Sequence, residues 1–299
     1  MPSLGLGLGL HRANRALFRG LLDQYGGAAA AYSLRALSSG WLAGDVVEVR
    51  RDADGATGII HKSFTEGEIN SGVMLAWVTE FSGTANGFVS TWYDQSGFAN
   101  DATQGTTTSQ PKIVDAGALV VNANGDNSLL FDNTDDFLSA NAVAASFSGT
   151  SMPASTFAVI EVTGAGNSAL YSLGNSSTGT QFQEPMLADG TYYEYFFRDD
   201  AAAIKSGSNI STYAGVDLAS SISSGTALDY LINGSNIVTA ADITLGSTTL
   251  NRFTIGALGR DLDSNFFGGY VVEMIVYPSD QTSNRVAIEA NINDAYTIY

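Results

Sequence analysis

A succession of short apolar runs, each interrupted by turn-forming residues, constrains the fold of this chain more than any other feature. The runs are rich in β-branched and aromatic residues, and Gly, Asn, Asp or Ser separates them. They are DVVEVRR, GFVSTWY, PKIV, LLF, TFAVIEV, ALYSL, TYYEYFF, ALDYLING, RFTIGAL and GGYVVEMIVYP. This punctuation predicts an antiparallel β-sandwich or jelly roll. We expect residues 29–299 to form one all-β domain, closed by a helix over SDQTSNRVAIEANINDAY.

Composition agrees with a β domain that has a substantial core. The chain has 299 residues, of which 44% are hydrophobic and only 14% charged, and it contains 33 Gly. This suffices for one large β domain or two ordinary ones, and low charge with abundant Gly suits short strands and tight turns. From their places in the alternating runs, we expect six side chains in the core: Trp92, Phe131, Phe157, Tyr230, Ile255 and Val272.

Charge and missing residue types exclude several functions. The formal net charge is −17, so the chain repels phosphate backbones and we expect no binding to nucleic acid. The absence of Cys excludes disulfides and thiolate metal sites, and 2 His are too few for a multi-histidine metal centre. No apolar run is long enough to span a membrane, and MPSLGLGLGL lacks the leading charges of a signal peptide.

Residues 1–28 differ from the rest and predict an attachment segment. In MPSLGLGLGL the leucines share one face of an extended strand that can add to a partner's sheet; the alternative is a floppy tail. HRANRALFRGLLDQYGG then predicts a basic amphipathic helix that docks on an acidic protein surface. We therefore expect residues 1–27 to contact other proteins or copies of this chain. The expected contact residues are Leu4, Leu6, Leu8, Leu10, Arg12, Arg15 and Arg19.

The stretch WYDQSGFANDATQ, at residues 92–104, breaks a strand with a dense run of turn residues. Asp94 opens a four-residue turn that ends at Gly97, and short polar side chains of this kind bond their own backbone. We prefer a fold-defining turn, because turn chemistry alone accounts for the residue types. The alternative is a ligand-binding loop in which Asp94, Gln95 and Asn100 make the contacts.

An acidic loop and an aromatic run offer further candidate sites. Asp132, Asp135 and Asp136 provide the oxygen ligands that calcium needs, although solvated turns explain the same residues. We expect no other cofactor. The run TYYEYFF predicts a strand with one core face and one face of exposed tyrosines, with Tyr192 as the candidate for ligand contact. Such tyrosines stack on sugar rings, or they pack against a neighbouring subunit or the N-terminal helix.

Several stretches together resemble a known family. FDNTDDFLSA, TFAVIEV, DYLINGSNI and TIGALGRDLDSNFFGGYVVEMIVYP resemble strands of concanavalin A-like, or laminin G-like, jelly rolls, in which a closing helix is also typical. AYSLRALSSGWLAGDVVEVRRDADGATGII followed by WYDQSGFANDATQ resembles the catalytic domain of fungal and bacterial α-L-arabinofuranosidase B. The resemblance covers most of residues 30–299 in patches, and it implies a concanavalin A-like jelly roll.

The resemblance to arabinofuranosidase B implies a retaining glycosidase with two catalytic carboxylates about 5 Å apart. Its acid/base Asp falls on Asp261 in ALGRD, where Arg260 replaces a family Gly. The nearest match to its nucleophile is Glu194, which Tyr195 follows instead of the family's Asn. We predict no efficient glycosidase activity, because this Glu lacks its surrounding motif and the family's cysteines are absent. Asp261 and Asp263 are then candidates for ligand binding.

The leading hypothesis is a structural virion protein of a bacteriophage, in a tail fibre, spike or head decoration. The acidic, Cys-free body rich in Gly, Ser, Thr and Asn resembles the concanavalin A-like domains of phage adhesion proteins. The expected role is to bind host surface glycan or to decorate the particle surface, after synthesis in the host cytoplasm. Other virion proteins would then be the partners of residues 1–27. The alternatives are a glycoside hydrolase that acts on surface polysaccharide and a bacterial surface lectin.

Overall fold

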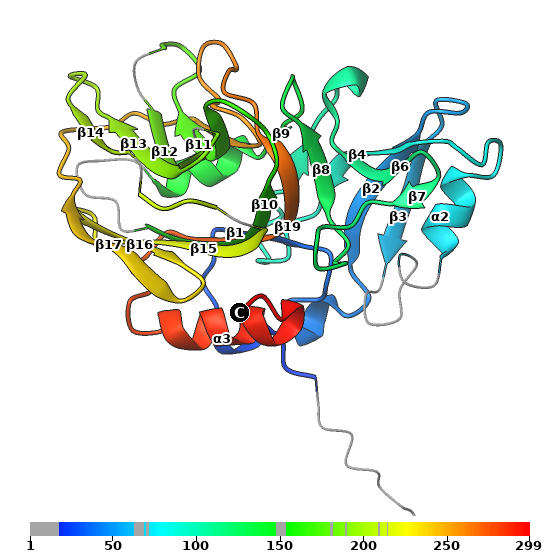
Figure 1. The fold of residues 1–299 in the computed structure, drawn as a ribbon, viewed down its shortest axis with the longest axis horizontal. Helices are drawn as coiled ribbons and strands as arrows, with labels where there is room; N and C mark the ends of the chain where they lie inside the picture. The colour runs from blue at the N-terminus through cyan, green and yellow to red at the C-terminus, as the bar shows by residue number, and fades with distance from the viewer. Residues whose placement is uncertain are drawn as a thin grey trace, which may run out of the picture.

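The computed structural model describes residues 18–62, 69, 72–147, 154–179, 182–188, 190–208, 210–213 and 215–299. Within these ranges the chain is mostly β, and the paired strands are antiparallel, as the sequence predicts. The later strands build a sandwich of two sheets on one side of Figure 1, and the early strands β2 to β7 extend from it on the other side. The prediction of an all-β sandwich with a C-terminal helix is confirmed.

The first sheet forms around β10 (Ala154–Val162) and β19 (Gly268–Tyr277), which pair along most of their lengths. On one side of β10 the sheet continues through β15 (Val216–Ser223), β16 (Ala227–Ile232) and β17 (Ser235–Asp242). The other edge of β19 is shared by β1 (Ala30–Ser33) and β8 (Leu129–Asp132). The first and last strands of the domain therefore lie side by side.

The second sheet runs through β14 (Ile204–Gly207), β13 (Tyr193–Arg198), β12 (Phe182–Ala188), β11 (Ser168–Gly174), β18 (Arg252–Ile255) and β9 (Leu138–Ser139). β9 leads to the extension through β5 (Ala102–Thr103), β4 (Gly87–Trp92), β2 (Asp45–Arg51) and β3 (Thr57–Lys62). β6 (Lys112–Asp115) pairs with β4, with β7 (Ala118–Leu119) and with β8. The hydrogen-bonded strands therefore run without a break from the sandwich into the extension.

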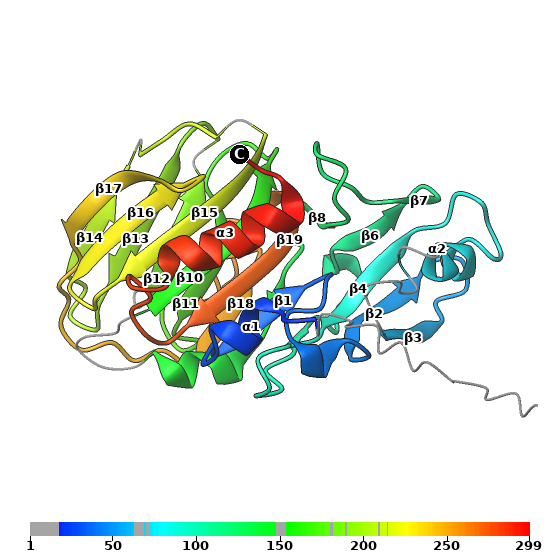
Figure 2. The same ribbon diagram turned by 90° about the horizontal axis from the view of Figure 1, so that it is seen from below.

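Few helices accompany these sheets in the described ranges. They are α1 (Leu21–Gln24), α2 (Val73–Val78), α3 (Arg285–Tyr296) and the 3-10 turns η1 (Ser39–Trp41), η2 (Thr107–Ser109) and η3 (Asn141–Ser146). α3 lies across the outer face of the first sheet, over β10, β15 and β19 (Figure 2). In the part of the chain that the structure describes, no helix is both long and apolar enough to cross a membrane.

The C-terminal helix begins later than predicted. Asp280 Oδ1 accepts hydrogen bonds from the backbone N–H of Thr282 at 2.8 Å and from its hydroxyl at 2.6 Å. This local bonding holds a turn, and α3 starts only at Arg285. Ile288 and Ile292 then point into the sheet and are fully buried.

All six residues expected in the core are buried, with at most 1% exposed. They divide between two clusters. Trp92, Phe131, Tyr230 and Ile255 lie in the large cluster that fills the sandwich and continues into the β2 to β7 extension. Phe157 and Val272 lie in a second cluster, between the first sheet and α3. Alternate side chains of β10 and β19 therefore point into two different cores, one on each face of the sheet.

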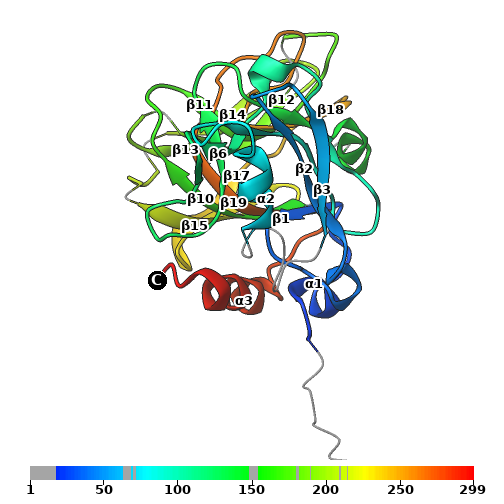
Figure 3. The ribbon, with the colours of Figure 1, turned by 90° about the vertical axis from the view of Figure 1, so that its right-hand side faces the viewer.

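For the described residues of the predicted attachment segment, which begin at residue 18, the prediction of a long helix that contacts other proteins is wrong. Residues 18–20 are not helical, and α1 has only 4 residues. Leu21 is fully buried in the cluster under α3, and the Leu22 N–H donates to the Leu37 carbonyl at 2.8 Å. Figure 3 shows α1 and α3 side by side beneath the strands. Residues 21–25 therefore pack on their own domain.

Most of the contact residues expected in the attachment segment lie outside the part of the chain that the structure describes. Leu4, Leu6, Leu8, Leu10, Arg12 and Arg15 lie outside the described residues. Arg19 is described and is exposed. Intermolecular contact of residues 1–17 stays a prediction.

Candidate functional site

The cavity that we call the Glu194 pocket lies between β13 and the segment 258–265, and it encloses about 390 Å³. It brings Glu194 of TYYEYFF together with Arg260 of ALGRD, although 65 residues of sequence separate them. Its lining consists of Asn167, Glu194, Tyr195, Phe196, Ser206, Gly207, Ser208, Leu258, Arg260 and Asn265.

The alternation of β13 decides which side chains reach this pocket. Tyr193, Tyr195 and Phe197 are buried, at 1%, 6% and 5% exposure. Glu194 and Phe196 point to the other, half-exposed face. Tyr193 and Tyr195 therefore lie on the buried face of β13, and Glu194 and Phe196 lie on the accessible one. Tyr192, which directly precedes the strand, is half-buried.

On the opposite wall of the pocket, Arg252 holds the segment 258–265 in place. Leu258 and Ser264 form an isolated β-bridge that closes the segment into a tight loop. The Arg252 guanidinium donates to the Arg260 carbonyl at 2.7 Å and pairs with Asp263 at 2.8 Å. Asp263, a predicted ligand-binding residue, is thus placed in an ion pair that supports the loop.

Arg260 lines the pocket from this loop. Its Nη1 donates to the Gly179 carbonyl at 2.9 Å, which holds the guanidinium in place. Asp261 is exposed, its Oδ1 accepts from the Leu262 N–H at 2.9 Å, and it does not line the pocket. The pocket therefore combines a single carboxylate, that of Glu194, with one guanidinium. Whether Glu194 and Asp261 act as a pair stays a prediction.

The ring of Tyr195 depends on a glycine in the neighbouring strand. Tyr195 pairs with Gly207 across β13 and β14. A Cβ at Gly207 would lie 2.5 Å from the Tyr195 ring, so only Gly leaves room for the ring there. Phe196 packs on the other face against Ala169 and Leu258. Of the two aromatic residues in the lining, Phe196 therefore lies on the pocket face of β13, whereas the Tyr195 ring lies on its buried face.

This arrangement suits the recognition of hydroxyl groups. A carboxylate accepts hydrogen bonds from sugar hydroxyls, a guanidinium donates to them, and the amides of Asn167 and Asn265 do both. Aromatic side chains supply the apolar surface on which sugar rings stack. The chemistry of the lining therefore fits a saccharide better than an apolar ligand.

The loop WYDQSGFAN fastens β1 to the rest of the domain. Asp94 is fully buried, and its carboxylate accepts from the backbone N–H groups of Ala31, Ser96 and Asn100 and from the Ser96 hydroxyl, at 2.6–3.0 Å. Gln95 is 3% exposed, and its amide accepts from the Leu37 N–H at 2.8 Å.

Further bonds of this loop reach the same part of the chain. The Gln95 amide donates to the Ser33 and Arg35 carbonyls at 3.0 and 2.9 Å. The Asn100 amide donates to the Ala29 carbonyl at 2.8 Å. With these side chains bonded to backbone, the geometry favours the fold-defining turn over a ligand-binding role for Asp94, Gln95 and Asn100.

The acidic group Asp132, Asp135 and Asp136 comes together as the sequence predicts. One oxygen from each carboxylate lies within 4.8 Å of the others. Burial, followed by repulsion from Asp132 and Asp135, raises the pKa of Asp136 to about 7. The Ser109 hydroxyl donates to Asp135 at 3.0 Å. Calcium at this place stays a prediction. Tyr192 is half-buried at an isolated bridge with Thr212, and its predicted ligand contact also stays untested.

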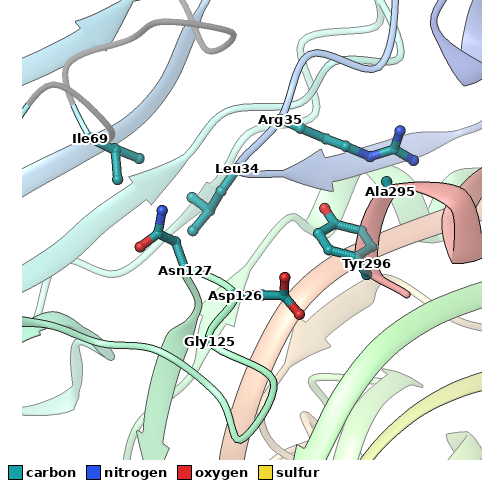
Figure 4. A pocket seen from close by; sticks show the side chains of 8 residues that line it. All are labelled: Leu34, Arg35, Ile69, Gly125, Asp126, Asn127, Ala295 and Tyr296. Carbon is teal, nitrogen blue, oxygen red and sulfur yellow. The ribbon is translucent and has the colours of Figure 1, made fainter. Parts of the chain in front are cut away.

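Another cavity, of about 260 Å³, lies where the end of β1, the loop 125–127 and the end of α3 meet. Figure 4 shows the Arg35 and Tyr296 side chains next to each other, with Asp126 below them. The Arg35 Cζ lies 5.4 Å from the centre of the Tyr296 ring. Because Arg35 already pairs with Glu273 at 2.7 Å, we assign this cavity a structural role.

Sequence reasoning missed most of the pocket lining. Asn167, Ser206 and Asn265 belong to ordinary turn or strand sequences, and only folding brings them to Glu194. Arg260 carried a signal: it is one of only 13 basic residues, and it stands inside an acidic loop. In a chain with net charge −17, an arginine among acidic residues indicates a specific interaction and not only a contribution to solubility.

Comparison with known proteins supports the fold. No family model and no curated protein matches this chain. It is similar to a GH54 α-L-arabinofuranosidase soaked with a cyclic sulfate inhibitor, with 17% identity and a TM-score of 0.60, over 90% of this chain and 63% of that one. It is similar, with 18% identity and the same TM-score of 0.60 over the same 90% and 63%, to an arabinofuranosidase complexed with arabinofuranosyl-α-1,2-xylobiose.

At 17–18% identity, this structural similarity shows the concanavalin-like β-sandwich fold and nothing about function. The chain spans 63% of the length of these neighbours, so their activity does not transfer with the fold.

Proposed function

We propose that this chain is a glycan-binding jelly-roll domain that does not hydrolyse its ligand. The observation that carries the proposal is the Glu194 pocket, which is lined by one acidic residue, Glu194, one basic residue, Arg260, and the aromatic Phe196. Retaining hydrolysis needs a second carboxylate about 5 Å from the first. Asp261, the only match for it, is exposed and outside the lining. Similarity to arabinofuranosidase structures is compatible with a saccharide ligand.

We further propose that the domain belongs to a bacteriophage virion, as part of a tail fibre, spike or head decoration. The support is the Leu/Gly segment at residues 4–10, which suits strand addition to another virion protein or another copy of the chain. The body is acidic and without Cys, which suits a surface protein that must not bind nucleic acid. A bacterial surface lectin has the same chemistry, and the genes next to this one distinguish the two.

Screening on a glycan array tests the binding proposal. The wild-type chain should bind a restricted set of surface glycans. Glu194→Gln and Arg260→Ala should each weaken that binding about tenfold, the loss of one charge-assisted hydrogen bond. Asp294→Asn is the matched control, because Asp294 is an exposed carboxylate on α3. Binding that is equal in wild type and both pocket variants would place the glycan elsewhere.

The second candidate function is a retaining glycosidase that acts on arabinose-containing or other surface polysaccharide. The observation in its favour is that Glu194 and the neighbour of Asp261 share one pocket. Turnover of aryl glycosides that Asp261→Asn abolishes would establish this function and overturn the non-catalytic one.

A further inference from the structure

A separate cavity of about 400 Å³ lies beside the WYDQSG loop, and we call it the Trp41 pocket. It shares no lining residue with the Glu194 pocket. Tyr93 directly follows β4 in the extension, whereas Glu194 lies on β13 in the sandwich, at the other side of Figure 1. Its lining consists of Trp41, Ala43, Gly44, Asp45, Tyr93, Asp94, Gly97, Ala99 and Asp101.

The indole of Trp41 is held in a fixed position. Its Nε1 donates to the Asp45 carbonyl at 2.9 Å. A Cβ at Gly44 would lie 2.6 Å from the indole, so one side of the ring rests on the Gly44 backbone. The side chain is nevertheless only half-buried. A half-exposed ring that is fixed in this way is ready to stack without a further loss of side-chain entropy.

The polar groups around the indole suit hydroxyls. Tyr93 and Asp101 are both half-buried. Asp101 uses Oδ1 to accept from the Asp94 N–H at 2.9 Å, and its other oxygen is bonded to no described residue. Burial, with the nearby carboxylates of Glu48, Asp45 and Asp101, raises the pKa of Tyr93. The phenol therefore keeps its proton and can donate to a ligand.

The lining also excludes other ligand classes. It contains no Lys or Arg, and its acidic side chains repel anionic sugars. Asp45, Asp94 and Asp101 do not converge on one point; in the described part of the chain, only Asp132, Asp135 and Asp136 do so. A metal ion is therefore not the ligand that this cavity fits.

We propose that the Trp41 pocket is a binding site for a neutral saccharide. The sugar ring stacks on the exposed face of Trp41, Tyr93 donates to a ring substituent, and Asp101 accepts from a hydroxyl. This site is additional to the Glu194 pocket and does not depend on it.

The test is saturation-transfer NMR on the full chain with the methyl glycosides of glucose, galactose, mannose and L-arabinofuranose. The methyl glycoside of glucuronic acid is included to test whether the pocket rejects an anionic sugar. In the Glu194→Gln background, at least one neutral glycoside should bind, and the glucuronide should not. Trp41→Ala should weaken that binding about tenfold, and Tyr93→Phe several-fold. Phe98→Ala is the control, because Phe98 is 67% exposed on the same loop and outside the lining.

Three results would overturn the proposal. The first is that none of the neutral glycosides binds at concentrations up to about 20 mM. The second is that binding is unchanged in Tyr93→Phe and in a folded Trp41→Ala. If Trp41→Ala lowers the melting temperature, Tyr93→Phe alone decides, since it keeps the ring. The third result is loss of binding in Glu194→Gln with normal binding in the Trp41 variants, which would reject this site and leave the proposed function intact.

Discussion

Arg35 and Glu273 form a two-bond ion pair inside the domain, with 2.7 Å between Arg35 Nε and Glu273 Oε2 and 2.9 Å between Arg35 Nη2 and Glu273 Oε1. The Glu273 side chain is only 1% exposed. The Ser33 and Tyr296 hydroxyls donate to the same carboxylate at 2.7 and 2.8 Å. One buried carboxylate thereby ties β1, β19 and α3 together.

Removing one partner of this pair should destabilise the domain strongly. Arg35→Met leaves the Glu273 charge buried without its cation, and we expect the free energy of unfolding to fall by about 3–5 kcal/mol. The double variant Arg35→Met/Glu273→Met should lose less than the sum of the single variants, because Ser33 and Tyr296 can then bond each other. Urea unfolding of the four proteins measures this coupling. Additive effects would show that the pair contributes nothing specific.

Asp94→Asn should be among the most destabilising single-atom changes in the chain. The carboxylate accepts four hydrogen bonds, and an amide would turn one acceptor toward N–H donors. We expect a loss of about 3 kcal/mol or more, since bonds to a buried charge contribute about 1.5–3 kcal/mol each. Phe98→Ala, on the same loop but 67% exposed, is the control and should change the melting temperature little. A stable Asp94→Asn protein with altered glycan binding would instead restore the ligand-binding interpretation of this loop.

The pH dependence of stability should carry a contribution from Asp136. Its pKa is raised from 3.8 to about 7 in the folded chain, chiefly by burial. The folded state therefore binds this proton more tightly than the unfolded state, and the resulting stability is present at low pH and lost as the pH rises toward 7. Asp136→Asn should remove this loss, so the variant should gain stability relative to wild type at pH 8 but not at pH 4. Unfolding curves at both pH values measure it.

Calcium bound to Asp132, Asp135 and Asp136 should, like the Asp136→Asn substitution, increase stability at pH 8. Added calcium would neutralise the carboxylates and raise the melting temperature of wild type at pH 8. The effect should be absent in Asp136→Asn. An equal rise in both proteins would assign the ion to another site.

Two truncations should separate attachment from folding. Deleting residues 1–17 should leave the melting temperature unchanged and abolish assembly, as expected of an attachment segment. Deleting residues 1–27 should also destabilise the domain by about 2–3 kcal/mol, because it removes the buried Leu21 from the cluster under α3. Calorimetry and analytical ultracentrifugation of both proteins provide the two readouts. Normal assembly of the shorter deletion would remove residues 1–17 from any role in attachment.

The strands were predictable where alternation was clear. DVVEVRR became β2 (Asp45–Arg51), because its alternating side chains match a sheet with one buried face. The strand VDLASSIS, at Val216–Ser223, was missed, because all eight residues are buried and most are small or polar. This segment is a strand because it pairs with β10 on one side and β16 on the other. Its own sequence does not indicate that pairing.

The site was less predictable than the fold. The sequence singled out Glu194 and Asp261, but only the structure shows that Arg260, and not Asp261, joins Glu194 in a pocket. It also could not show that the tyrosines of β13 face inward, because the run of aromatics suits either face. Pairing of side chains far apart in sequence depends on strand register, which local patterns do not specify.

Proton NMR of the array-selected glycan mixed with the wild-type chain tests most directly whether the domain binds without hydrolysis. We predict saturation transfer from protein to glycan, weakened by Glu194→Gln and Arg260→Ala, with no new anomeric signals after prolonged incubation. New anomeric signals from wild type that disappear with Asp261→Asn would contradict this account and identify the chain as a glycosidase.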